Sequence, residues 1–66
     1  GLKCVKRILA QAAEYLADGG LLVMEVGEIW PELERYYPDI PFTWVDFQRG
    51  GEGVFVLRKD ELASLT

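Results

Sequence analysis

Four apolar residues follow one another from Leu21 to Met24, and this run constrains the fold more than any other feature of the sequence. Glu25 and Val26 extend the run, and Gly27 ends it. A short continuous run of strand-forming residues is typical of a parallel strand that is covered on both faces. The chain has 66 residues, which is too few to build a covering layer on each side of a sheet. The sequence therefore predicts a sheet with one face that needs a partner.

Helical periodicity flanks this run on both sides. Apolar residues recur at three- and four-residue spacing over 2–16, which predicts an amphipathic helix that ends at the glycines of 18–20. A shorter helix is expected over 29–37, because Pro31 suits a first helical turn and Pro38 closes the pattern. The remaining expected elements are strands at 42–47 and 54–57, a glycine-rich turn at 48–53 and a last helical turn at 60–65.

The order of these elements predicts an α/β topology. A helix lies between the first two strands, so a right-handed parallel crossover is favoured. The hairpin makes the last strand antiparallel to the second, and a last strand that inserts between the other two gives the spatial order first, third, second. Residues 1–66 then form one small unit with three strands and two helices, and both helices cover the same face.

Composition excludes several classes of function. The net charge is −4, whereas a generic nucleic-acid-binding protein carries a basic excess. The chain has no histidine and a single cysteine, Cys4, so zinc sites of the Cys/His type, histidine-based triads and an internal disulfide are excluded, and no metal site is expected. No apolar run is long enough for a membrane span. A free thiol without a visible signal peptide suits the cytoplasm.

Three stretches together resemble the C-terminal end of HemK-type methyltransferases, and most closely their PrmB branch. They are EVG at 25–27, YPDIPFTW at 37–44 and GGEGVF at 50–55. The resemblance covers almost the whole chain but only about the last fifth of such an enzyme. The chain departs from the family at Glu28 and Ile29, where the family has Asn and Ser, and this departure puts a polar substrate-rim role in doubt.

The resemblance implies a Rossmann-like sheet whose final hairpin inserts an antiparallel strand beside the fifth strand. It also implies an enzyme that uses S-adenosylmethionine to methylate a glutamine side-chain amide of a large-subunit ribosomal protein. The family's cofactor loop and its Asn-Pro-Pro-Tyr motif have no counterpart here, since the chain has no asparagine and no adjacent prolines. No catalytic or cofactor-binding residue is therefore carried over, and the chain alone is expected neither to bind the cofactor nor to turn over.

The candidate site lies where the predicted parallel strands end, because ligands in open α/β sheets bind beyond the carboxyl ends of the strands. Glu25 is the most interesting candidate, since burial there would make its carboxyl a hydrogen-bonding group for a substrate; it could instead cap backbone amides or reach solvent. The turn resembles a phosphate-binding loop in composition only, because it joins two strands rather than a strand and a helix. The substrate-rim candidates are Glu25, Gly27, Glu28, Gly50, Gly51, Glu52 and Gly53.

Two further groups of residues have both a functional and a structural interpretation. Lys3, Lys6 and Arg7 form a basic edge that could meet ribosomal RNA, although a solvated helix face is the simpler interpretation. Nothing in the sequence activates the Cys4 thiol. The aromatic residues could stack on bases, but a domain of this size needs them as core; they are Trp30, Phe42, Trp44, Phe47 and Phe55.

Two functions of different classes follow from the sequence. The first is the C-terminal segment of a protein-glutamine methyltransferase, with a ribosomal protein as its partner. The second is a self-contained α/β interaction module that dimerises through its uncovered sheet face. Under either interpretation, the chain on its own is expected to self-associate.

Overall fold

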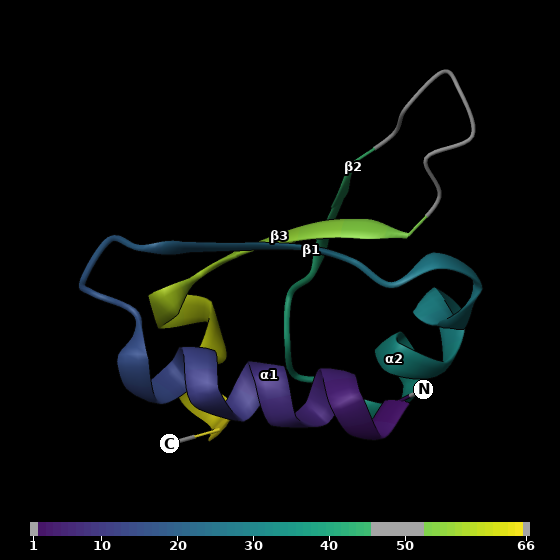
Figure 1. Ribbon diagram of the computed structural model, residues 1–66, viewed down its shortest axis with the longest axis horizontal. Coiled ribbons are helices and arrows are strands. Elements are labelled where there is room, and N and C mark those ends of the chain that lie inside the picture. Colours follow the sequence, from purple (N-terminus) through teal and green to yellow (C-terminus); the bar gives the residue numbers. More distant parts are fainter. Residues whose placement is uncertain (1, 46–52, 66) are drawn as a thin grey trace.

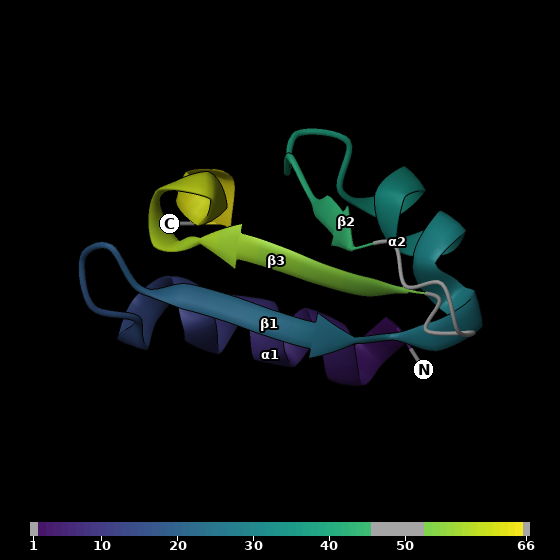
Figure 2. The ribbon, with the colours of Figure 1, turned by 90° about the horizontal axis from the view of Figure 1, so that it is seen from above.

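The central strand of the sheet is the last strand in the chain. The computed structural model describes residues 2–45 and 53–65. It has the strands β1 (Leu21–Glu25), β2 (Thr43–Val45) and β3 (Val54–Arg58), in the spatial order β1-β3-β2 (Figure 2). Both β1 and β2 run antiparallel to β3 and are therefore parallel to each other. The predicted strand order and the predicted direction of the hairpin are confirmed.

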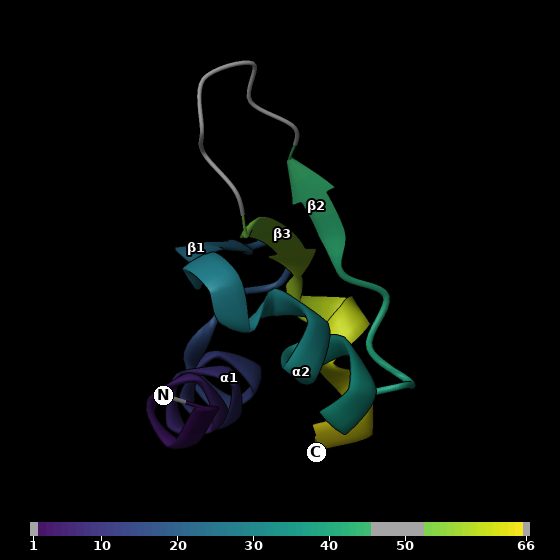
Figure 3. The same ribbon diagram turned by 90° about the vertical axis from the view of Figure 1, so that its right-hand side faces the viewer.

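The helices lie on one side of this sheet (Figures 1 and 3). Helix α1 (Leu2–Tyr15) runs below β1, and α2 (Trp30–Tyr36) follows the short 3-10 turn η1 (Gly27–Ile29). A second 3-10 segment, η2 (Lys59–Leu65), packs against α1. The prediction that both helices cover the same face is confirmed. None of the described helices is long and apolar enough to cross a membrane.

The core lies between the sheet and the helices. Helix α1 forms because its apolar residues share one face, and that face is the one it buries. Helix α2 contributes one buried leucine, and Pro31 occupies its first turn as predicted. The buried residues are Val5, Leu9, Ala13, Leu33, Ile40, Phe55, Leu57 and Leu62.

Alternation along the strands divides their side chains between two faces. Phe55 and Leu57 of β3 are fully buried beneath the sheet, whereas the intervening residues of β3 and the odd-numbered residues of β1 point to the other side. There Val23 pairs with Val56, and 62% of Val23 and 56% of Leu21 are exposed. No described helix lies on this side. We call it the uncovered face; its residues are Leu21, Val23, Glu25, Thr43, Val45, Val54, Val56 and Arg58.

The outer edge of β1 is open as well. Flanking the strand, the Lys59 amide donates to the Gly20 carbonyl at 3.0 Å, and the Val26 amide donates to the Gly53 carbonyl at 2.7 Å. Backbone groups in an antiparallel pair alternate between facing the partner strand and facing away from it. The amides and carbonyls of Leu21, Val23 and Glu25 therefore point away from β3, and no described strand pairs with them.

Several boundaries differ from the predicted ones. Strand β2 begins at Thr43 rather than at residue 42, because the Phe42 amide turns back to the Ile40 carbonyl at 2.9 Å. The predicted end of this strand at 46–47 lies outside the described residues. Strand β3 continues to Arg58, where its amide donates to the Glu61 carboxylate at 2.8 Å and η2 begins. Hydrophobic periodicity does not predict these local hydrogen bonds, and so it does not predict the boundaries that they set.

The two faces of the sheet can be compared with one type of substitution. We expect Leu57→Ala to lower the free energy of unfolding by about 2–5 kcal/mol, because it opens a cavity in the core. Leu21→Ala on the uncovered face should cost about 1 kcal/mol or less. Denaturant titration followed by circular dichroism measures both values. Equal losses would show that the face is covered in solution.

Candidate functional site at the carboxyl end of β1

The predicted rim residues converge at one edge of the sheet. Strand β1 ends at Glu25, and the chain turns at Gly27 into η1 and α2. Gly53, just before β3, lies beside this turn because its carbonyl accepts the hydrogen bond from the Val26 amide. The structure therefore brings Glu25, Gly27, Glu28 and Gly53 together. The other predicted rim residues, Gly50, Gly51 and Glu52, lie outside the described residues.

Gly27 and Gly53 meet backbone to backbone. Both have left-handed backbone conformations, with φ of +62° at Gly27 and +76° at Gly53. A Cβ atom on Gly53 would overlap the Gly27 carbonyl oxygen and would lie 2.7 Å from its amide nitrogen. A Cβ atom on Gly27 would meet nothing within 4 Å. Position 53 thus requires glycine for two reasons, its conformation and the space around it.

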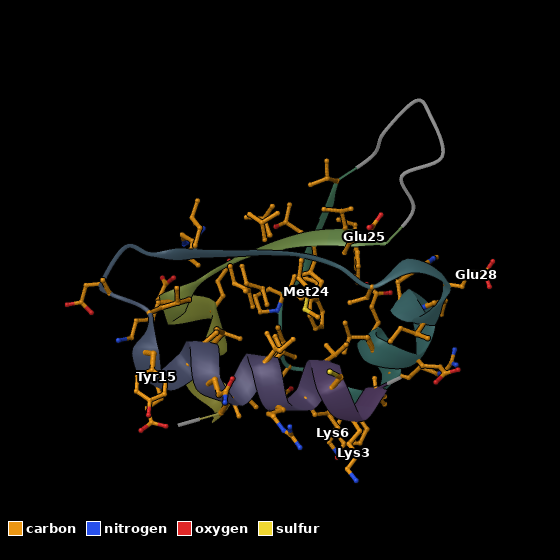
Figure 4. The ribbon with its side chains drawn as sticks, in the orientation of Figure 1. Lys3, Lys6, Tyr15, Met24, Glu25 and Glu28 are labelled. Atoms are coloured by element: carbon orange, nitrogen blue, oxygen red, sulfur yellow. The ribbon has the colours of Figure 1, made fainter. Side chains whose placement is uncertain are left out.

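The two rim carboxylates that the structure describes, Glu25 and Glu28, point to solvent. Glu25 is exposed on the uncovered face, above the sheet in Figure 4, while its neighbour Met24 points down toward α1. Of the interpretations of Glu25 considered above, the structure agrees with the one in which the side chain reaches solvent, because its odd-numbered place in the strand puts it on the face without helices. Glu28 is exposed at the end of the molecule where α2 lies. Neither carboxylate forms an ion pair or hydrogen bond with the described residues.

The basic edge divides into two parts. Lys3 and Arg7 are exposed, as a solvated helix face would be. Lys6 instead reaches across to α2, where its ammonium lies 4.4 Å from the centre of the Tyr36 ring. The hydrogen-bonding contact with Tyr36 raises the pKa of Lys6 above its ordinary value. Lys6 therefore joins the start of α1 to the end of α2. Of this basic edge, Lys3 and Arg7 have no charged partner among the described residues.

The aromatic residues form a packed cluster between β2, β3 and α2. Phe55 is fully buried, and Phe42 and Trp44 pack against it with ring centres 5.1 and 5.6 Å away. The Trp44 indole nitrogen donates to the Glu34 carboxylate at 2.7 Å. Trp30, 5.7 Å from Trp44 between ring centres, is exposed. The core interpretation holds for Phe42, Trp44 and Phe55 but not for Trp30. The predicted fifth member, Phe47, lies outside the described residues.

A surface depression lies at the other end of the molecule. It has a volume of about 490 Å³ and lies between the end of α1, the turn at Gly19 and the start of η2. Its charges pair with one another, since Arg58 contacts Asp60 at 3.1 Å and Lys59 contacts Asp18 at 4.0 Å. Sequence reasoning did not identify it, and its residues form no catalytic pattern. We therefore place no function there.

The chain carries neither the cofactor loop nor the Asn-Pro-Pro-Tyr motif that the resemblance implies for the whole enzyme. Within 2–45 and 53–65, no group of three or more Cys, Asp and Glu side chains could hold a metal ion. We derive no chemical step through S-adenosylmethionine from these residues.

The chain is similar to known methyltransferases along almost its whole length. It is 47% identical over 62 residues to the ribosomal protein uL3 glutamine methyltransferase of Francisella tularensis subsp. tularensis, strain SCHU S4. It is 39% identical over 62 residues to the protein of the same name in Neisseria gonorrhoeae, strain ATCC 700825. These matches cover 94% of this chain but only 20% and 21% of the relatives, so the chain spans about a fifth of their length.

No protein-family model matches the chain, and no solved structure matches it significantly. The similarity to the two methyltransferases confirms the resemblance predicted from the three stretches of sequence.

The contact between the two glycines can be tested with alanine. Gly53→Ala should lower the free energy of unfolding by about 3 kcal/mol, since it adds a backbone clash to an unfavourable φ. Gly19→Ala is the matched control, because Gly19 has a φ of +78° and open space around it. It should cost about 1 kcal/mol. Equal losses in a denaturant titration would contradict the clash.

Proposed function

We propose that this chain, which is related to the HemK-type methyltransferases over almost its whole length, forms the C-terminal segment of an enzyme that methylates the side-chain amide of a glutamine in a ribosomal protein. The identity of 47% along 94% of the chain carries the proposal. The methyl donor of the whole enzyme is S-adenosylmethionine. The remaining four fifths of such an enzyme would supply the cofactor site and the catalytic groups. A cytoplasmic location is part of the proposal, because it keeps the exposed Cys4 thiol reduced.

The topology supports a role in completing a larger sheet. Helices α1 and α2 lie on the same face, and α2 connects β1 to its parallel neighbour β2 beyond β3 (Figure 3). Helical crossovers between parallel strands are right-handed in about 98% of cases. A strand that leads into α1 and returns as β1 would therefore lie on the side of β1 away from β2. That side is the open edge.

The direction of such a strand follows from the position of α1. Helix α1 begins at the end of the molecule where β1 ends (Figure 1). A strand that enters α1 would end there too, and would run parallel to β1. The outward backbone groups of Leu21, Val23 and Glu25 are free to pair with it. The chain would then contribute β1, β3 and β2 to one edge of a longer sheet.

The uncovered face supports the same proposal. Its exposed valine and leucine side chains are those expected of a surface that helices cover elsewhere in the enzyme. A self-contained interaction module would also use this face. The long alignment with enzymes about five times the chain's length favours the segment over the module.

The proposal predicts where activity resides. The 66-residue chain should transfer no methyl group above a blank without enzyme. The longer protein that contains it should transfer a tritiated methyl group from S-adenosylmethionine to ribosomal protein uL3, and mass spectrometry should locate the label on a glutamine. Turnover by the short chain, or no turnover by the longer protein, would overturn the proposal.

The isolated chain should self-associate through the uncovered face. Light scattering after size exclusion should show species larger than a monomer at micromolar concentration. Val23→Lys should shift the chain toward monomer, because it places a charge among the exposed apolar side chains of the face. Gln11→Lys, which adds the same charge on the exposed side of α1, is the matched control and should leave the assembly unchanged. A monomeric wild-type chain would contradict this prediction.

A further inference from the structure

The contact between Gly27 and Gly53 joins three elements at one point. Val26 donates its amide to Gly53, and Gly53 is followed at once by β3. Gly27 begins η1, which continues directly into α2. The end of β1, the beginning of β3 and the beginning of α2 are therefore fixed relative to one another through backbone atoms alone. We call this contact the glycine pin.

The glycine pin leaves its neighbourhood little freedom. A side chain on Gly53 would strike backbone, which cannot rotate away as the end of a long side chain can. The turn that carries Glu28 starts at Gly27, and so its position depends on the pin. The open glycine at position 19, at the other end of the sheet, holds no second segment in this way.

The pin lies at the carboxyl end of β1, the edge at which α/β sheets bind their ligands. We infer that Gly53 is a positioning residue for binding of the acceptor protein, and that it acts by holding the Gly27–Ile29 turn, with Glu28, at the rim of the substrate site. This inference rests on the proposed function. Gly53 itself has no side chain with which to contact a substrate, and it acts through the turn beside it.

The partner that suits this turn is a basic segment of protein. Glu28 is exposed and has no partner among the described residues. Glu25, on the adjacent strand end, is exposed too (Figure 4). Proteins that bind RNA carry an excess of Lys and Arg. A ribosomal protein therefore offers the complementary charge, and a displaced turn would weaken that contact.

The test uses the full-length enzyme, with ribosomal protein uL3 and tritiated S-adenosylmethionine as substrates. Gly53→Ala should raise the KM for uL3 about tenfold or more. The KM for S-adenosylmethionine and the kcat should change by less than about twofold. Gly19→Ala, the control with the same backbone conformation and no clash, should leave both KM values unchanged.

A purely structural role would give a different result. Partial unfolding of Gly53→Ala would lower the apparent kcat and leave the KM for uL3 unchanged, and this result would overturn the inference. A parallel rise in both KM values would overturn it as well. If wild-type enzyme methylated no acceptor, the proposed function itself would fail, and the inference with it.

A second variant keeps the inference testable if Gly53→Ala does not fold. Glu28→Gln removes the charge from the pinned turn without adding bulk. It should raise the KM for uL3 by about two- to fivefold at low salt, and the difference from wild type should shrink as salt is added. An unchanged KM in Glu28→Gln, with Gly53→Ala unfolded, would overturn the inference.

Discussion

The pairing of β1 and β2 with β3 is the interaction on which the rest of the structure depends. Neither outer strand pairs with any other described strand, and the side chains of β3 that point toward the helices, Phe55 and Leu57, are fully buried. The register of this pairing decides which residues enter the core. A shift by one residue would send Phe55 and Leu57 to the uncovered face and would bring Val54 and Val56 inside. The helices pack on one side because that side of β3 carries its largest apolar side chains, Phe55 and Leu57.

The same register explains the exposed residues. Every residue of β1 that points away from the helices also directs its backbone groups away from β3, since both alternate with the period of the strand. Leu21 and Val23 therefore lie at an open edge and on an uncovered face at once. A partner that supplied both a strand and a helix would cover the two surfaces together. This coincidence is the strongest structural argument that the chain is one side of a larger α/β sheet.

Hydrophobic periodicity was sufficient to predict the elements, their order and the one-sided covering of the sheet. The parallel relation of β1 and β2 followed from the intervening helix, and the central place of β3 from the hairpin. The positions that depend on single hydrogen bonds did not follow, such as the turn at Phe42 and the start of η2 after Arg58. At the rim, the strand pattern correctly predicted that Glu25 and Gly27 lie where β1 ends. The face on which Glu25 lies depends on register with β3, which no local pattern encodes.

The glycines show a similar limit to what the sequence alone can predict. Within 2–45 and 53–65, three glycines have left-handed backbone conformations, at 19, 27 and 53. They are equivalent in sequence, because each follows or precedes a strand or helix in a turn. Only the tertiary contact distinguishes Gly53, whose missing side chain makes room for the backbone of Gly27. Sequence reasoning interpreted the glycine-rich segment as a source of positive φ angles, which is correct at Gly53. The close approach of two backbones is a second requirement, and it arises only when β3 inserts beside β1. The same insertion that builds the core therefore also builds the rim.

The apolar run in β1 is best understood as evidence about surroundings that the short chain does not contain. Leu22 and Met24 pack against the core, while Leu21 and Val23, equally apolar, face outward. Exposed residues of a self-sufficient strand are usually polar, because antiparallel sheets with one solvated face alternate apolar and polar side chains. The prediction that β1 is covered on both faces does not describe the isolated chain. It describes the environment that this strand would have in an enzyme about five times as long, and the relatives that match the chain are of that length.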